Sequence, residues 1–380
     1  MNRKQLMSRI TFPLNKGRHS KQAHADLPTG TYEREVSRNG FFGSSTQLYH
    51  THKPVGWKSI DGDLTPRAFK LKEIEETSRC PHDAPTVVFN GDGKIRYWKV
   101  SEEMTHLVIN ADGDELLFIQ EGSGEIFCDF GNISYRDGDY VLIPRCTQWR
   151  LVPNCHTEIL MIEATGESFY LPEKGITGYH SIFDRSMIVT AEINDKFLAQ
   201  HSEKQTIVKI KRNNRITAVQ YPYNPLDAVG WHGEVSVLKI NWRDIRPIVS
   251  HRYNLPPSVH FTFITAKFDI ATLTPRPIES DPGALKVPFF HTNADEDEFM
   301  FHHKGQSFAR DEMIPGYAIL HPIGIVHGPQ PGAFKIGEKS QRKYTDEVVI
   351  KIDFKNALSI GDIDLKIEDT KYQYCWTEEN

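Results

Sequence analysis

The segments HTNADEDEFMF (residues 291–301) and LHPIGIVHGPQPG (residues 320–332) decide the fold predicted for this chain of 380 residues. Each reads as a short β-strand beside a turn, because aromatic and β-branched residues stand next to Asn, Asp, Gly and Pro. Together they carry His291, His327 and an acidic run at residues 295–298. Two imidazoles and one carboxylate on a rigid scaffold can hold one face of an octahedral metal and leave the other open. That arrangement suits non-haem Fe(II) and oxygen chemistry.

The same segments resemble the two sequence motifs of the cupin barrel. The first motif reads H-x-N-x4-E over residues 291–298, and the second, P-x-G-x-x-H, is matched throughout by residues 322–327. Successive strand residues point to opposite faces, so one chain can direct several ligands into a barrel interior. Asn293 replaces the second histidine of the first motif, and Asp297 stays open as an alternative to Glu298. The predicted metal ligands are His291, Glu298 and His327.

An internal repeat indicates that the chain holds two related units. NADGDE (residues 110–115) recurs as NADEDE (residues 293–298). Downstream, GDYVLIPRCTQW (residues 138–149) stands where GYAILHPIGIVH (residues 316–327) stands in the second copy. Agreement of two separate segments in order and spacing favours a duplicated supersecondary unit.

Only the second copy keeps the predicted ligands, because the alignment puts Val108 and Trp149 at the positions of the two histidines. Short strand-like runs separated by turn residues fill much of the chain, with one short helix expected near residues 192–201. We therefore predict a mainly β, double-cupin (bicupin) protein of two β-barrel or jelly-roll halves, with the metal site in the C-terminal half. The predicted domains are residues 1–240, with the degenerate copy at about 100–170, and residues 241–380.

Composition restricts the classes of function. Hydrophobic residues make up 39% and charged residues 25% of the chain, and a net charge of -5 favours neither nucleic acid nor an anionic membrane surface. No stretch approaches the ~18–20 continuous apolar residues of a membrane span. The basic N-terminal segment lacks the apolar run of a secretory signal, so we expect a cytoplasmic protein. The five cysteines form no CxxC pair, so no disulfide framework is expected.

Further histidines are candidates for acid–base or substrate-binding roles. His251 and His260 flank a strand-like segment, and either could act as a general base because imidazole titrates nearest neutral pH. His321 could line the pocket or support a ligand from behind. The roles of the adjacent His302 and His303 stay open, because neighbours on a strand point to opposite faces.

The C-terminal half, from about residue 228 to 331, resembles homogentisate 1,2-dioxygenase. The similar segments are VGWHG (229–233), PSVHFTFITAK (257–267), FFHTNADEDEFM (289–300) and LHPIGIVHGP (320–329). The resemblance implies a homo-oligomer, either a trimer or a hexamer built as a dimer of trimers. It also implies the site roles: Fe(II) on His291, Glu298 and His327, His251 as catalytic acid/base, and His321 as a substrate-binding residue.

The activity implied by this resemblance is Fe(II)-dependent ring cleavage. Homogentisate and O₂ would give maleylacetoacetate, in tyrosine or phenylacetate catabolism. Phe289, Phe290 and Ser307 stand where the family has tyrosines that border the substrate, so a related hydroxylated aromatic acid such as gentisate is an alternative. A metal-dependent cupin isomerase is another, because two histidines and a glutamate also suit Zn²⁺, and a non-enzymatic binding cupin is a third. We expect a small aromatic acid and O₂ as partners, with no nucleic acid and no membrane.

Overall fold

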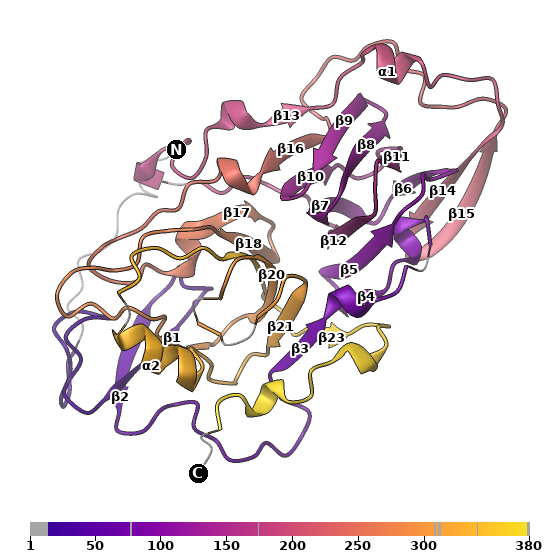
Figure 1. Ribbon diagram of the computed structural model, residues 1–380. Helices are drawn as coiled ribbons and strands as arrows, with labels where there is room; N and C mark the ends of the chain where they lie inside the picture. Colours follow the sequence, from indigo (N-terminus) through magenta and orange to yellow (C-terminus); the bar gives the residue numbers. More distant parts are fainter. Residues whose placement is uncertain are drawn as a thin grey trace.

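The computed structural model describes residues 14–377 except 77, 174, 308, 311, 312 and 340, and in this part the chain is mainly β, as predicted (Figure 1). The outer ends of the two predicted domains, residues 1–13 and 378–380, lie outside the described residues. Four sheets hold the strands, and they form two related units. Closure of either unit into a barrel stays a prediction.

Two sheets make up most of the first unit. The eight-stranded sheet has the order β13 (Val189–Thr190), β16 (Leu238–Asn241), β10 (Asp139–Ile143), β7 (Gly113–Glu121), β12 (Thr157–Thr165), β5 (Gly93–Val100), β4 (Thr86–Phe89), β23 (Ser359–Ile360). A six-stranded sheet has the order β15 (Arg215–Tyr221), β14 (Thr206–Arg212), β6 (Leu107–Asn110), β11 (Trp149–Pro153), β8 (Ser123–Cys128), β9 (Gly131–Arg136).

Two further sheets make up the second unit. The six-stranded sheet has the order β17 (Phe261–Ile264), β18 (Phe268–Leu273), β22 (Val348–Phe354), β20 (Asp297–Lys304), β21 (Tyr317–His321), β3 (Arg67–Lys70). The three-stranded sheet has the order β19 (Phe290–Asn293), β1 (Tyr32–Ser37), β2 (Ser45–His50).

Helices are short in the described part of the chain. α1 (Asp195–Leu198) lies inside the segment predicted to be helical, and its N-cap Asn194 accepts a hydrogen bond from the backbone N–H of Phe197. α2 (Pro331–Lys339) follows the second metal motif and was not predicted. Single 3₁₀ turns span Leu71–Glu73, Pro81–Asp83, Gly175–Thr177, Arg185–Met187, Trp242–Asp244, Pro257–His260, Leu365–Ile367 and Tyr372–Tyr374.

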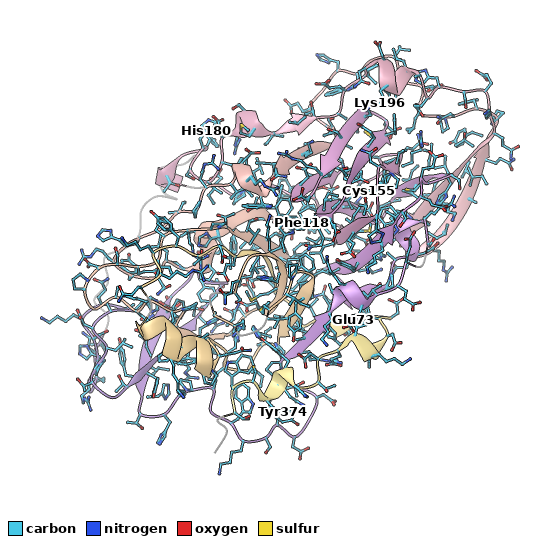
Figure 2. The ribbon with its side chains drawn as sticks, viewed as in Figure 1. Glu73, Phe118, Cys155, His180, Lys196 and Tyr374 are labelled. Carbon is cyan, nitrogen blue, oxygen red and sulfur yellow. The ribbon has the colours of Figure 1, made fainter. Side chains whose placement is uncertain are left out.

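The central strands β10, β7, β12 and β5 of the eight-stranded sheet are buried on both faces, which explains why they read as nearly continuous apolar runs. On β7, Leu117 and Ile119 belong to the core between the two sheets of the first unit. Leu116 and Phe118 belong to a second core that joins this sheet to the six-stranded sheet of the second unit. Figure 2 labels Phe118 where the two units meet, and its ring lies 6.3 Å from that of Phe301. The two units therefore share a core.

Strands from the first 70 residues complete the second unit. β1 pairs in parallel with β19, and β3 pairs antiparallel with β21. Conversely, β23, which follows the second unit in the sequence, pairs with β4 of the first unit. Figure 1 shows this exchange, because indigo strands lie among orange ones and yellow β23 lies near β4. The predicted boundary after residue 240 is therefore crossed by paired strands, and a division there stays a prediction.

The pairing registers of the two units agree with the internal repeat. Glu115 on β7 lies between β10 and β12, as Glu298 on β20 lies between β21 and β22. Trp149 pairs with Val108 across two antiparallel strands, just as the two predicted ligand histidines pair with each other. The alignment of the copies therefore holds in three dimensions.

None of the helices in the described residues is long and apolar enough to cross a membrane.

Candidate metal centre

The three predicted ligands come together inside the second unit. His291 lies on β19, Glu298 on β20 and His327 in the turn after β21, and one ligand atom of each lies within 4.8 Å of the others. The Nε2 atoms of His291 and His327 lie 3.9 and 3.5 Å from carboxylate oxygens of Glu298. The first distance ends on Oε2 and the second on Oε1. Ligands on one face of an octahedral ion at about 2.1 Å lie about 3 Å apart, so an ion bound here would draw these atoms together by about 1 Å or less.

The backbone fixes the two imidazoles side by side. The N–H of His291 donates to the carbonyl of His327 at 2.8 Å, and the N–H of His327 donates back at 3.0 Å. This isolated antiparallel bridge brings the ring centroids to 4.1 Å. Main-chain geometry therefore sets the spacing of the two predicted ligand histidines.

Hydrogen bonds to the Nδ1 atoms assign the tautomers of both histidines. Nδ1 of His291 faces the carbonyl of Phe289 at 3.3 Å, and Nδ1 of His327 faces the carbonyl of Ile325 at 3.2 Å. A carbonyl only accepts, so the proton sits on Nδ1 and the Nε2 lone pair points toward Glu298. Both Nε2 atoms are buried and have no hydrogen-bond partner among the described residues. Buried unsatisfied nitrogens with oriented rings fit metal ligands.

Geometry favours Glu298 over Asp297 as the carboxylate ligand. The two Asp297 oxygens accept hydrogen bonds from the backbone N–H groups of Ile323 and Leu358, both at 2.7 Å. Asp297 thus ties two loops to the start of β20. Because adjacent strand residues point to opposite faces, Glu298 is the one directed at the histidines.

Glu298 is held as a carboxylate by a buried lysine that the sequence analysis missed. Lys351 on β22 places Nζ 3.1 Å from Glu298 Oε2 and forms a second ion pair with Asp353. Burial alone would raise the pKa of the Glu298 carboxyl, but the Lys351 ammonium and the facing histidines hold it well below its usual range. Burial also raises the pKa of Asp353 to about 7. The only signal for Lys351 in the sequence is a charge inside the apolar strand VVIKIDF.

His321 lies behind the ligand carboxylate. Its Nδ1 is 2.8 Å from Glu298 Oε1, its side chain is 0% exposed, and its ring stacks on that of His327 with centroids 4.3 Å apart. It does not line the pocket in front of the ligands. This placement suits support of Glu298 better than the predicted contact with substrate.

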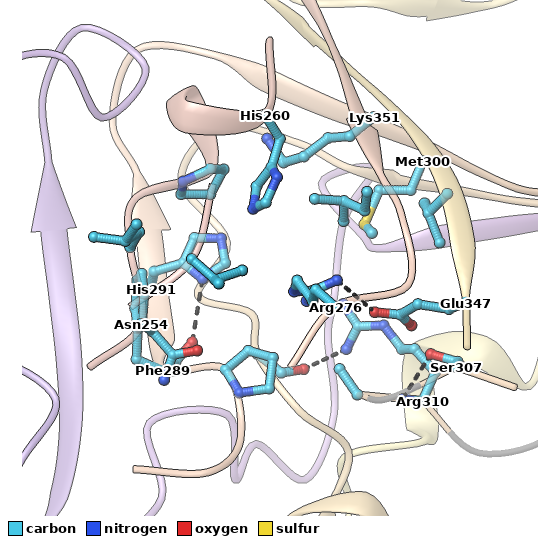
Figure 3. A pocket seen from close by; sticks show the side chains of 18 of the residues that line it. Asn254, His260, Arg276, Phe289, His291, Met300, Ser307, Arg310, Glu347 and Lys351 are labelled. Atoms are coloured by element: carbon cyan, nitrogen blue, oxygen red, sulfur yellow. Dashed lines mark hydrogen bonds and ion pairs between the residues drawn. The ribbon is translucent and has the colours of Figure 1, made fainter. Parts of the chain in front are cut away.

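Among the histidines that are not predicted ligands, His260 is one that lines the pocket. An open pocket in front of the predicted ligands is lined by His260, His291, Glu298 and Lys351, and Figure 3 labels His260, His291 and Lys351 around it. His251, which was predicted as the acid/base, is exposed and does not line this pocket. His251 lies in an exposed loop, whereas the 3₁₀ turn Pro257–His260 ends with His260 buried at the pocket.

Apolar and cationic side chains share the rest of this pocket. Figure 3 shows Arg276 paired with Glu347, at 3.5 Å, and Arg310 beside Ser307. Apolar lining residues include Leu255, Leu273, Met300, Met313 and Val349. Such a pocket suits an aromatic ring that carries an acidic group.

His302 and His303 have structural positions. Nε2 of His302 lies 2.8 Å from the carbonyl of Gly305 in the turn after β20. Nδ1 of His303 lies 2.8 Å from Gln120 Oε1 in the first unit, and burial lowers the pKa of His303 to about 3. Both rings are therefore used in packing away from the predicted ligands.

The matching position in the first unit has no equivalent triad. Val108 and Trp149 replace the two histidines, as aligned. Glu115 is buried there, with the Nε2 of His82 3.8 Å away and no third ligand-type side chain grouped with them among the described residues. Burial and the nearby Glu163 raise the pKa of Glu115 to about 7.

Comparisons with known proteins point to one family. A family model described as "Homogentisate 1,2-dioxygenase N-terminal" matches residues 76–241. A protein of Saccharolobus solfataricus that carries the provisional name of a dioxygenase is 28% identical over 358 residues, covering 90% of this chain and 92% of that protein. The family model falls mostly on the first unit, whereas the metal motifs lie in the second.

Two homogentisate 1,2-dioxygenases are also similar. The enzyme of Dictyostelium discoideum is 25% identical, with 97% of this chain and 93% of that protein covered. That of Bradyrhizobium diazoefficiens is 27% identical over 62% of this chain, so the chain spans about half, 53%, of that protein. Among solved structures, a cupin barrel domain protein from Leptotrichia buccalis has a TM-score of 0.32 at 9% identity, covering 76% of this chain and 96% of that one.

Proposed function

The chain belongs to the homogentisate 1,2-dioxygenase family, and we propose that it is an Fe(II)-dependent dioxygenase that opens the ring of a hydroxylated aromatic acid. Homogentisate, which would give maleylacetoacetate in tyrosine or phenylacetate catabolism, is the substrate that we propose first. Gentisate is the alternative, because phenylalanines and a serine stand where the family has tyrosines beside the substrate.

One observation carries the proposal. Two imidazoles with unpartnered Nε2 atoms converge with one ionised carboxylate, and two members of this set, His291 and Glu298, line an open pocket. Three protein ligands on one side leave the pocket side for substrate and oxygen. Ferrous iron bound there would supply coordination positions for both and a path for electrons from the ring to O₂. A closed structural metal site would need a fourth protein ligand.

The residues around the pocket then have separate roles. Leu273, Met300 and Val349 would pack against the aromatic ring and exclude water from it. Lys351 is already paired with Glu298 and Asp353, but Arg276 lines the pocket with only a long, 3.5 Å contact to Glu347. Its remaining guanidinium N–H groups would donate to an acidic side chain of the substrate. Neutral aromatic compounds would lack this attraction and should bind more weakly.

We propose His260, in place of His251, as the group that takes the phenolic proton. His260 shares the pocket with His291 and Glu298, whereas His251 is exposed. Replacing His260 by alanine should lower turnover and leave bound iron unchanged, because His260 is not a predicted ligand. The matched change His251→Ala should have little effect on either, and the reverse pattern would restore the first assignment.

Oxygen uptake by iron-loaded protein tests the function. We expect consumption of one O₂ per ring opened with homogentisate, gentisate or 3-hydroxyanthranilate, compared side by side after anaerobic loading with Fe(II). His291→Ala and His327→Ala should lose most of the iron and all of the oxygen uptake. Activity with Zn²⁺ and no oxygen consumption would instead favour a cupin isomerase, and no turnover with any metal would favour a binding protein.

The assembly is also a proposal. We expect a homo-oligomer, a trimer or a hexamer, and sedimentation of the purified protein would measure its mass directly.

A further inference from the structure

The C-terminal segment packs against the back of the metal centre. Tyr372, in the 3₁₀ turn Tyr372–Tyr374, is 4% exposed, and its hydroxyl lies 2.9 Å from His321 Nε2. Trp376 is buried beside it and donates its indole N–H to the carbonyl of Gly328 at 3.2 Å. Two side chains from the end of the chain thus enclose His321 on the side away from the pocket.

The partners of His321 determine where its proton lies. At Nε2 it meets the Tyr372 hydroxyl at 2.9 Å and the Arg310 guanidinium at 3.5 Å. A guanidinium can only donate, so Nε2 must act as an acceptor there. The remaining proton of the neutral ring is then on Nδ1, which donates to Glu298 Oε1 at 2.8 Å. Hydrogen bonds therefore run in one direction, from Tyr372 through His321 to the ligand carboxylate.

We propose that Tyr372 is a positioning residue for the metal centre, because its hydroxyl hydrogen-bonds to His321 Nε2 and orients the ring whose Nδ1–H donates to Glu298. This inference rests on the proposed metal site. Without the hydroxyl, Nε2 keeps only the 3.5 Å contact with Arg310, which is too long to hold the ring firmly. The His321 ring can then turn, and its Nδ1–H no longer holds the Glu298 oxygen at 2.8 Å. The carboxylate is therefore less well fixed in the position that it shares with the two predicted ligand histidines.

Metal affinity is the readout that separates this role from simple packing. Loss of a residue that hydrogen-bonds to a metal ligand from behind typically weakens metal binding by roughly 10–100-fold. We therefore expect the Kd for Co²⁺ to rise roughly 10-fold in Tyr372→Phe. Tyr374→Phe is the matched control, because Tyr374 lies in the same turn and is 50% exposed. Co²⁺ absorption titrations of the full-length, metal-free protein give Kd directly. A purely structural effect would lower the unfolding midpoint and leave Kd unchanged.

The same substitution made in a His321 variant tests whether Tyr372 acts through His321. Asparagine places an amide N–H near the Nδ1 position and has nothing at Nε2, so His321→Asn keeps a donor for Glu298 and removes the partner of Tyr372. We expect Tyr372→Phe to weaken Co²⁺ binding in the wild type and to have no further effect in His321→Asn. An unchanged Kd in Tyr372→Phe, or an equal loss in both backgrounds, would overturn the inference. Absence of Co²⁺ and Fe²⁺ binding by the wild type would refute the metal site itself.

Discussion

Replacing Lys351 by methionine removes one buried positive charge from the centre of the site and keeps the length of the side chain. The lysine side chain is 4% exposed, and its ammonium lies 3.1 Å from Glu298 Oε2 and contacts Asp353 as well. The substitution therefore leaves two buried carboxylates without their shared counter-ion. Metal-free protein should be destabilised, and bound metal should offset much of the loss.

The magnitude follows from the distance and the burial. Two unit charges 3.1 Å apart attract by about 5 kcal/mol at an effective dielectric constant of about 20. Loss of one partner of a buried ion pair typically costs about 3–5 kcal/mol. Asp353, with a pKa of about 7, can take up a proton and relieve part of the repulsion. We therefore expect a loss of about 3 kcal/mol in the free energy of unfolding at neutral pH.

Urea unfolding of the metal-free protein, repeated with excess Co²⁺, measures both parts of this prediction. Lys355→Met is the control, because Lys355 is exposed and its Nζ donates to the backbone carbonyl of Ala266 rather than to a buried carboxylate. The control should change stability by less than about 0.5 kcal/mol. The reasoning is refuted if metal-free Lys351→Met is as stable as the metal-free wild type. It is also refuted if Co²⁺ raises the stability of Lys351→Met no more than that of the wild type.

Four further substitutions test His24 in the segment before β1, the shared core, and the choice of carboxylate ligand. Burial disfavours the charged His24 imidazolium, but the two glutamates of β1 outweigh it and raise its pKa to about 9. The stability that the charged His24 contributes should be fully present below about pH 6.5 and lost as the pH rises through about 9. The urea unfolding midpoints of the wild type and His24→Ala should therefore approach each other as the pH rises through about 9. Phe118→Ala should cost about 3–5 kcal/mol in urea unfolding, and a loss below about 1 kcal/mol would contradict the shared core. Asp297→Asn should lower stability by about 2 kcal/mol and keep Co²⁺ affinity, whereas Glu298→Gln should abolish binding; the opposite result would exchange their roles.

Local patterns predicted many of the strands and the convergence of the three candidate ligands. The apolar run at residues 114–120 lies within β7, and the run at residues 157–164 lies within β12, because strand length and flanking turns are local properties. The repeat predicted that Val108 and Trp149 would pair as the ligand histidines do, and they do so. Motif spacing predicted that His291, Glu298 and His327 converge, because strand alternation and a fixed turn leave little freedom.

Features that depend on distant segments were not predicted. The pairing of β1 with β19 joins residues more than 250 positions apart, and no local pattern encodes it. Lys351 looks like an isolated charge in an apolar strand until the fold brings Glu298 beside it. His251 and His260 are both histidines beside the same strand, so the sequence does not distinguish them. The path of the loop between them decides which one reaches the pocket, and sequence spacing did not predict that path.

Anomalous diffraction at the iron edge, from crystals loaded anaerobically with Fe(II), tests the central claim most directly. We predict one strong peak per chain, within bonding distance of His291 Nε2, His327 Nε2 and a Glu298 oxygen, with the open side of the ion toward the pocket lined by His260. A fully loaded crystal with no peak between these three side chains, or with its iron bound elsewhere, would contradict the account.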